Sequence, residues 1–226
     1  MASPPPTLPQ AAAARAAAPT RRRTGRLASA AVIMEAATTL FLRKGYAGTS
    51  MDEIAALAGV SKQTIYTHFA DKEHLFSDLI LRNAARVDEF VEQVGGILDD
   101  SHGLEKPLLE LARRYIHLVI RPEVLQLRRL VIGEAGNFPD LAGTYYQRVP
   151  ERVLSTLASN LERLAGRGLL RMDDPMLAAN HFVALILWVP LDRAMFHIEQ
   201  ESLEPGRLEQ LAHAGVRVFL AAYGTS

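Results

Sequence analysis

The sequence predicts an all-α protein, with a small N-terminal domain built on a helix-turn-helix and a larger C-terminal helical domain. Hydrophobic residues recur at helical spacing through most of the chain, and no segment shows the alternation of a β-strand. Two short helical patterns joined by a glycine occur at residues 50–69. The expected divisions are a disordered Ala/Pro-rich arm at 1–24, the helix-turn-helix domain at 25–75 and the larger domain at 76–226.

The segment SMDEIAALAGVSKQTIYTHF, residues 50–69, carries the signals for two packed helices. Ser50 and Glu53 have the spacing of a capping box, which predicts the start of the first helix. Gly59 follows that helix at a position where a left-handed backbone is easily adopted only by glycine. Ser61 is then placed to cap the second helix.

The second helix of this pair has a polar face opposite the buried stripe of Ile65 and Phe69. Glutamine can pair with adenine, lysine can reach guanine or phosphate, and threonine can contact a thymine methyl, so the composition suits the DNA major groove. A generic amphipathic hairpin is the alternative, but caps, glycine and polar face all agree with a DNA reader. The face consists of Lys62, Gln63, Thr64, Tyr66 and Thr67.

Basic residues occur on both sides of this pair. Four arginines at the end of the arm are expected to lie along phosphates or enter the minor groove, the alternative being a solvated basic tail. They are Arg21, Arg22, Arg23 and Arg26. Lys72 falls in the first turn of the helix capped by Asp71, where a cation opposes the helix dipole. A phosphate contact would compensate this, whereas a solvated lysine is the alternative.

The formal net charge is zero, but it is unevenly divided along the chain. Residues 1–75 carry nine Lys and Arg against five Asp and Glu, whereas the remainder carries sixteen against twenty. The basic excess therefore coincides with the predicted DNA reader, and the acidic second part would not bind DNA by itself.

The chain from about Leu27 to Leu81 resembles the DNA-binding domain of the TetR/AcrR family of bacterial one-component transcription regulators. The resemblance rests on the segments AVIMEAATTLFLRKGY, GTSMDEIAALAGVS and TIYTHFADKEHLF. It implies a cytoplasmic, nucleoid-associated homodimer that binds a palindromic DNA operator. The residues that it implies as DNA contacts are Thr49, Lys62, Gln63, Thr64, Tyr66, Thr67, His68 and Lys72. The helical wheel places His68 near the packed side, so its role is expected to be partly structural.

The second part of the chain shows only helical patterning. Helices are expected at roughly 104–120, 122–135, 140–166, 174–197 and 205–222. Breaks are expected at Gly95–Gly96, near Pro122, and at 136–139, 166–168 and 204–206. The order of segments, especially GRGLLRMDDPMLAANHFVALILW, resembles the C-terminal domain of AefR-like members of the same family. That resemblance implies a sensor and dimerisation domain.

The last two expected helices have apolar stripes that suit a four-helix bundle made from two subunits. The alternative is that the stripes face the core of their own domain. The expected interface residues are Leu177, Ala184, Leu191, Met195, Leu208, Leu211, Ala212, Gly215 and Phe219, with His181 and Trp188 on the first stripe.

Scattered aromatic and polar groups on apolar helices suggest a cavity for a small apolar or amphipathic molecule. Ordinary core packing is the alternative for each of them. The candidates are Tyr115, His117, Phe138, Tyr145, Tyr146, His181, Trp188 and Asp192.

Other classes of protein lack support in the sequence. No nucleophile elbow, phosphate loop, H-E-x-x-H or paired Glu-x-x-His motif occurs, so no enzyme activity, metal or cofactor is expected. The absence of cysteine excludes disulfides and thiolate chemistry. The N-terminus lacks the basic start of a signal peptide. The uncharged stretch of 17 residues at 175–191 predicts a buried helix, not a membrane span.

These observations predict a ligand-responsive transcription regulator, most simply a dimeric repressor released from its operator by a small molecule. The alternatives are a DNA-binding regulator without such an inducer, controlled constitutively or by a protein partner, and an activator.

Overall fold

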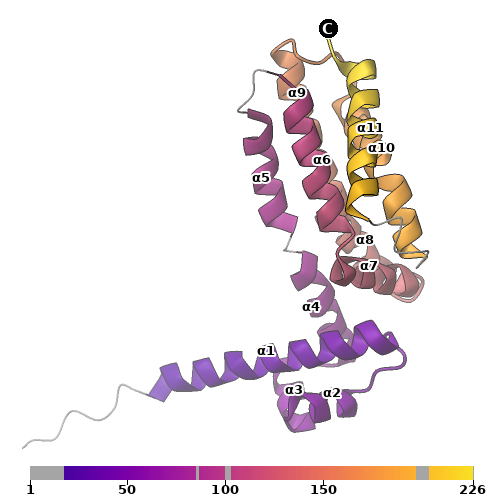
Figure 1. Ribbon diagram of the computed structural model, residues 1–226. Helices are drawn as coiled ribbons and strands as arrows, with labels where there is room; N and C mark the ends of the chain where they lie inside the picture. Colours follow the sequence, from indigo (N-terminus) through magenta and orange to yellow (C-terminus); the bar gives the residue numbers. More distant parts are fainter. Residues whose placement is uncertain (1–17, 85–86, 100–102, 197–203, 226) are drawn as a thin grey trace, which may run out of the picture.

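The computed structural model describes residues 18–84, 87–99, 103–196 and 204–225. In these residues the chain is helical, apart from turns and one isolated bridge between Leu170 and Gly224. Figure 1 shows a small N-terminal group of helices below a long helical bundle. The expected all-α class is therefore confirmed.

The N-terminal group contains four helices, in which α2 and α3 lie against α1 on the side remote from the bundle (Figure 1). They are α1 (Ala18–Lys44), α2 (Met51–Ala58), α3 (Lys62–His68) and α4 (Lys72–Ala84). One face of α1 fills the core behind α2, α3 and α4, as its spacing predicts. That face consists of Ile33, Ala36, Ala37, Leu40 and Phe41. The other members of this core, from α2, α3, the end of α3 and α4, include Ile54, Ile65, Phe69, Phe76 and Ile80.

Helix α1 extends further toward the N-terminus than the sequence suggested. It begins at Ala18, so residues 18–24, predicted as part of a disordered arm, are helical. Arg22, Arg23 and Arg26 are on this first part of the helix. The rest of the predicted arm, residues 1–17, lies outside the described residues.

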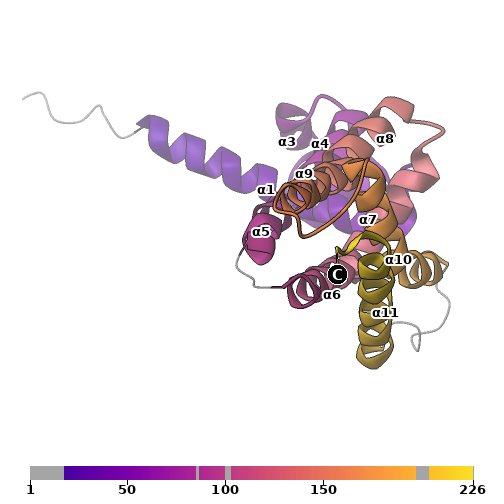
Figure 2. The same ribbon diagram turned by 90° about the horizontal axis from the view of Figure 1, so that it is seen from above.

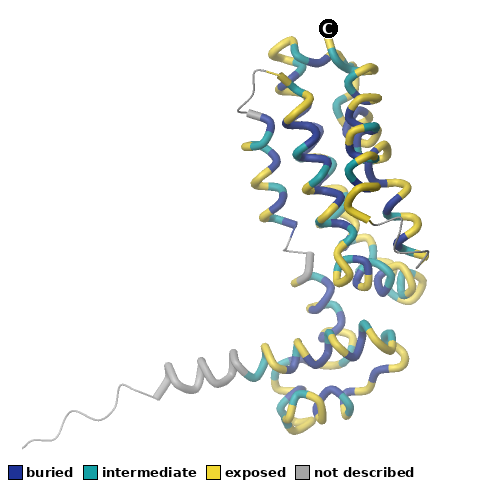
Figure 3. Tube along the Cα trace, viewed as in Figure 1, coloured by how far each residue is buried: buried dark blue, intermediate teal, exposed yellow. Residues whose placement is uncertain are grey.

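The bundle above consists of five helices that contact one another in a ring, in the order α5, α6, α11, α10 and α9 (Figure 2). Their bounds are α5 (Val87–Asp99), α6 (Glu105–Val119), α9 (Arg152–Gly166), α10 (Pro175–Met195) and α11 (Pro205–Tyr223). Buried positions line the inner face of each helix (Figure 3). The predicted break at Gly95–Gly96 is wrong, because α5 passes through both glycines and is held by its contacts with α6 and α9.

Two helices, α7 (Pro122–Glu134) and α8 (Pro139–Tyr146), lie between the bundle and the N-terminal group (Figure 1). Helix α7 contacts α1, and α8 contacts α4. A π-helical turn, η1 (Gln147–Glu151), then joins α8 to α9 and contains Pro150. The segment predicted as a single helix at 140–166 is therefore helical throughout, but its backbone hydrogen bonds change register at this turn.

The stretch at 175–191 forms most of α10, which is long and apolar enough by composition to cross a membrane. A core helix of a soluble protein meets the same criterion, and one face of α10 is buried against α9 and α11. Phe182 and Ile186 on this face are buried in the bundle core, whereas Trp188 is exposed, so the expected buried helix is confirmed for one face only.

The stripe predicted on α11 as a dimer interface instead packs inside its own chain. Four of its members are buried, because α11 closes the bundle against α6 and α10. They are Leu208, Ala212, Gly215 and Phe219. A Cβ atom at Gly215 would stand 2.6 Å from Cγ2 of Ile186, so glycine allows the close approach of α10 and α11. Assigning these four residues to the dimer interface was therefore wrong.

Candidate DNA-binding site and internal cavity

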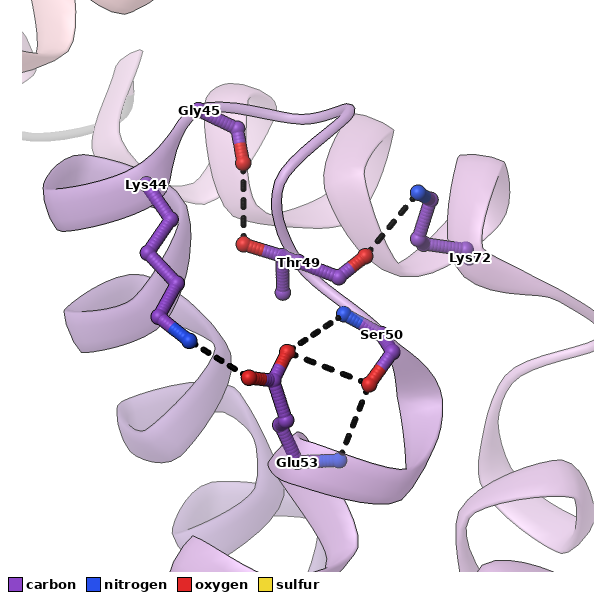
Figure 4. Close-up of polar contacts among 6 residues, drawn as sticks. All are labelled: Lys44, Gly45, Thr49, Ser50, Glu53 and Lys72. Atoms are coloured by element: carbon purple, nitrogen blue, oxygen red, sulfur yellow. Dashed lines mark hydrogen bonds and ion pairs between the residues drawn. The ribbon is translucent and has the colours of Figure 1, made fainter.

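Helix α2 begins with the capping box that the sequence predicted (Figure 4). The Glu53 backbone N–H donates to Oγ of Ser50 at 3.2 Å, and the Ser50 N–H donates to Oε2 of Glu53 at 3.0 Å. Lys44, at the end of α1, donates to the other carboxylate oxygen of Glu53. These contacts fix the start of α2 to the end of α1.

The Glu53 carboxylate makes the start of α2 sensitive to acid. Hydrogen bonds from Lys44 and Ser50 lower the pKa of Glu53 from 4.5 to about 2. Since the folded pKa is the depressed one, the stabilisation is complete above about pH 4.5 and is lost as the pH falls toward 2. We expect Glu53→Gln to lower the Tm at pH 7, and this difference from wild type to shrink by pH 3 in thermal unfolding. An equal difference at both pH values would contradict this assignment.

The turn between α2 and α3 has the predicted geometry. Gly59 adopts a left-handed conformation, with φ of 65°, and its N–H donates back to the last turn of α2. Ser61 caps α3 by accepting a hydrogen bond from the Thr64 N–H at 3.1 Å. Ile65 is fully buried against α1 and α2, which sets the rotation of α3 about its axis.

That rotation leaves the polar face of α3 on the surface. Lys62, Gln63, Tyr66 and Thr67 are exposed, with Tyr66 retaining 43% of its accessible surface, and Thr64 is half-buried. The Thr64 hydroxyl is engaged with that of Ser61, and the Thr67 hydroxyl donates to the Gln63 carbonyl. Gln63 and Tyr66 are therefore the long side chains best placed to reach into a groove.

Lys62 is paired with Asp52 across the two helices. Nζ of Lys62 donates to Oδ2 of Asp52 at 3.0 Å, and this hydrogen bond raises the lysine pKa. Both side chains are well exposed. The pair holds the lysine at the start of α3 but places a negative charge on the surface that is predicted to face DNA phosphates.

We expect Asp52→Asn to strengthen binding to any DNA duplex, because it removes that negative charge and frees Lys62 for phosphate. The gain should be several-fold at low salt, and the slope of log K against log salt should steepen by about one unit. Fluorescence anisotropy across a salt series measures both quantities. Asp173→Asn, at an exposed site in the bundle, is the control. Unchanged DNA affinity in Asp52→Asn would show that Lys62 does not approach phosphate.

Two of the implied DNA contacts are placed differently by the structure. Thr49 is only 2% exposed, and its hydroxyl donates to the Gly45 carbonyl at 2.8 Å (Figure 4). Nζ of Lys72 donates to the carbonyls of Tyr46 and Thr49, each at 3.0 Å, and lies 4.1 Å above the Tyr46 ring. Both residues thus hold the loop between α1 and α2. Assigning the Thr49 side chain to DNA was wrong. The positive charge of Lys72, which is unfavourable in the first turn of α4, is compensated by hydrogen bonds to two carbonyls of this chain.

His68 is half-buried at the end of α3, with its ring 6.3 Å from that of Phe69. This agrees with a partly structural role. Nothing is described of the side chains of Arg22, Arg23 and Arg26, whose predicted DNA contacts remain expectations.

A cavity lies between the core of the bundle and the core of the N-terminal group. The volume of this cavity is about 70 Å³. Of the eight residues predicted for a pocket, Tyr115 and Tyr145 line it. Lining residues that sequence reasoning missed include Leu127, Arg128, Val149 and Pro150. Pro150 carried a signal, since a proline inside a predicted helix interrupts its hydrogen bonds. Arg128 carried none, because α7 also contains Arg129 and two glutamates.

The other six predicted pocket residues lie elsewhere. Phe138 packs in an aromatic cluster with Tyr46 and Phe76, because the turn before α8 docks on the N-terminal group. His117 lies on a separate surface groove, and Tyr146 lies on a more open groove that shares Arg128, Tyr145 and Pro150 with the cavity. His181, Trp188 and Asp192 are exposed on the outer face of α10, so their assignment to this cavity was wrong.

Comparisons with known proteins agree with this architecture. The sequence profile described as "Bacterial regulatory proteins, tetR family" matches residues 33–79, which span the C-terminal part of α1, all of α2 and α3, and most of α4. The profile described as "AefR-like transcriptional repressor, C-terminal domain" matches residues 106–225, more than half of the chain. The chain belongs to the TetR family. It is therefore a DNA-binding transcription regulator and not an enzyme.

Relatives of this TetR-family regulator match along most of their length. The HTH-type transcriptional regulator YhgD of Bacillus subtilis is 30% identical over 165 residues, covering 71% of this chain and 80% of the relative. The repressor AcnR of Corynebacterium efficiens is 31% identical over 144 residues, covering 64% and 70%.

Solved structures show the same fold. A TetR-family regulator from Mesorhizobium loti has a TM-score of 0.80 at 42% identity, covering 88% of this chain and 98% of its own. The flavonoid-responsive regulator FrrA has a TM-score of 0.72 at 34% identity, with the same coverage. Among the described residues, no group of three or more His, Cys, Asp or Glu could hold a metal ion.

Proposed function

We propose that this regulator is a ligand-responsive repressor that binds a palindromic operator as a homodimer in the cytoplasm, at the nucleoid. The observation that carries the proposal is the placement of the cavity. Tyr145 and Leu127 line it and also belong to the core that contains α1 to α4. A molecule entering the cavity would press directly on residues that support the DNA-binding helices.

A hydrogen bond and a cluster of aromatic rings also connect α7 and α8 with the loop after α1. The Tyr46 N–H, in the loop after α1, donates to Oε1 of Glu134 at the end of α7 at 3.3 Å. The Tyr46 ring lies 4.7 Å from that of Phe138 and 5.0 Å from that of Phe76. Displacement of α7 or α8 would therefore move the α1–α2 loop. A ligand would shift the dimer between DNA-binding and released states by no more than its differential affinity for them.

The surface proposed for dimerisation is the outer face of α10 with the adjoining part of α11. Its apolar side chains lack cover within the described part of the chain, and Trp188 retains 69% of its accessible surface. The exposed apolar members are Leu177, Ala184, Leu185, Trp188, Val189 and Val218. His181 and Asp192 lie on the same face, and Leu191, Met195 and Leu211 are half-buried beside it. Two copies related by a twofold axis would place their recognition helices about one DNA turn apart, roughly 34 Å.

We expect Trp188→Glu to convert the dimer into a monomer, since pairing would bury an uncompensated carboxylate. The dimer dissociation constant should rise by roughly a hundredfold or more. Light scattering after size-exclusion chromatography measures the mass. Ile132→Glu is the matched control, because Ile132 is 58% exposed on α7, away from this face. A monomer in the control alone would place the interface on α7.

The relatives support repression and a ligand. The C-terminal profile and the AcnR proteins are described as repressors, and FrrA is described as flavonoid-responsive. A match of 40% identity over 62 residues to the activator FasR of Mycolicibacterium smegmatis keeps activation of transcription as the alternative to repression. The second candidate function is control without a small molecule. The size of the cavity favours it, since about 70 Å³ is well below the roughly 300 Å³ of ordinary ligand pockets.

The proposed function is tested by titrating the protein into labelled DNA from the region upstream of its own gene, at about 150 mM salt. Preferential binding over a scrambled duplex supports a local, site-specific regulator. Equal binding to both contradicts a local operator. A reporter on the same region should become active when the gene is deleted, whereas one that falls silent would identify an activator.

A further inference from the structure

The cavity between the two cores has apolar walls and only four polar side chains. Val87, Val119 and Val153 are among the apolar members, contributed by three different helices. The polar members are Tyr115, Glu123, Arg128 and Tyr145. A site of this composition accepts a mainly apolar molecule and orients it through a few polar groups.

Three of those polar groups are without partners in the described part of the chain. No described group hydrogen-bonds the phenol of Tyr115 or of Tyr145, or pairs with the guanidinium of Arg128. Tyr115 is more than nine-tenths buried, Tyr145 is buried and Arg128 is half-buried. No buried side-chain nitrogen or oxygen in the described residues lacks a hydrogen-bond partner, so these unpaired polar atoms are accessible to solvent. A ligand oxygen can therefore take the place of water on them.

The protonation states of these groups favour an acceptor ligand. Burial raises the pKa of Tyr115 to about 12 and also raises the pKa of Tyr145, although the charge of Arg128 opposes both shifts. Both phenols therefore remain donors at neutral pH, next to a permanent cation. Glu123 is the one acidic side chain on the lining, and it is exposed at the opposite end of α7 from Glu134.

Arg128 and Tyr145 also form the boundary with the outside. Together with Pro150, they line a second, more open groove of about 170 Å³. The apolar members of that groove include Val131, Ile132 and Ala142. Pro150 stands in the π-helical turn, a type of irregularity that is frequent at functional sites. The inner cavity and the outer groove are thus separated by two long side chains that can change rotamer, and together they offer room for a larger molecule.

We propose that the effector is an amphipathic acid, with its apolar body in the inner cavity and its anionic group held by Arg128 between the phenols of Tyr115 and Tyr145. This rests on the proposed ligand response and specifies the chemistry of its site. The guanidinium donates only and carries a permanent positive charge, and each neutral phenol has an O–H to donate, so together they match the oxygens of a carboxylate and disfavour a cation. A neutral apolar molecule would displace water from these three groups without replacing its hydrogen bonds.

The test uses two pairs of probes that differ only in charge: octanoate against octanamide, and 2-naphthoate against 2-naphthamide. Binding to the full-length protein is measured by isothermal titration calorimetry. We expect at least one acid to bind at least about tenfold tighter than its amide. Arg128→Gln should abolish this preference, and Tyr115→Phe with Tyr145→Phe should weaken the acid several-fold while keeping the volume of the cavity. Arg121→Gln, an exposed arginine at the start of α7, should change nothing.

Equal or tighter binding of both amides would overturn the proposal, as would an unchanged acid preference in Arg128→Gln. Failure of all four probes to bind would also overturn it. Each protein is assayed in parallel for binding to its upstream DNA without any probe. Loss of DNA binding by the wild type would contradict the proposed function, whereas intact DNA binding with no acid preference would contradict only the ligand class.

Discussion

Replacing Gln63 and Tyr66 together by alanine is expected to abolish site-specific DNA binding. Each side chain projects from the exposed face of α3, and neither contributes to the core that holds the helix. A base or phosphate contact of this kind accounts for about 1–3 kcal/mol, and a dimer loses each contact twice. We therefore expect the affinity for the operator to fall by at least about a hundredfold, with the Tm within about 2 °C of wild type.

The matched control replaces Tyr146 and Gln147, the same two residue types, at exposed positions where α8 ends and η1 begins. Its operator affinity should equal that of the wild type in fluorescence anisotropy. A scrambled duplex separates loss of base recognition from loss of phosphate contact, since the latter would weaken both duplexes alike. Full operator affinity in the double variant would mean that α3 is not the recognition helix.

Phe76→Ala is expected to produce the largest loss of stability among single substitutions. Phe76 is 1% exposed on α4, and its ring lies 5.1 Å from that of Phe41 and 5.5 Å from that of Phe138. Removing the ring leaves a cavity where α1, α4 and the turn before α8 meet. Deletions of this type cost about 3–5 kcal/mol. Urea unfolding, followed by circular dichroism, measures the change in the free energy of unfolding.

Phe196→Ala is the control for the same chemical change, because Phe196 is 71% exposed at the end of α10. Its free energy of unfolding should change by less than about 0.5 kcal/mol at a protein concentration where the dimer persists. Because Phe76 joins the two groups of helices, its loss should also reduce operator affinity before unfolding is complete. A loss below about 1 kcal/mol in Phe76→Ala would show that the two cores relax around the missing ring.

The helix-turn-helix could be predicted residue by residue because its signals are local. The contact of Ser50 with Glu53, the left-handed Gly59 and the cap at Ser61 each involve residues within about one helical turn. The rotation of α3 followed from Ile65 and Phe69, which share one face of a short helix. The other bundle helices were predicted from the same periodicity, but α5 was not, because Gly95 and Gly96 indicated a break where tertiary contacts hold a helix.

Long-range packing decided the rest of the candidate site. Periodicity shows that a helix has an apolar face, but it does not show which neighbour covers that face. The α11 stripe was therefore assigned to a partner, although Gly215 and Phe219 pack within the same chain. His181 and Trp188 were assigned to a pocket for the same reason, although both are exposed. Lys72 appeared free to bind phosphate because its carbonyl partners lie 23 and 26 residues away in the chain.

The sequence by itself determined the class of this protein, its helix-turn-helix and the exposed polar residues on α3, because caps, turns and amphipathic periodicity act over a few residues. Only the tertiary structure decided which residues surround the cavity and how the cavity is connected to the DNA-binding helices. Tyr145 and Leu127 line the cavity and also belong to the core of the N-terminal group, because α7 and α8 pack against both cores. That arrangement depends on contacts between helices far apart in the chain, whose pairing no local pattern encodes.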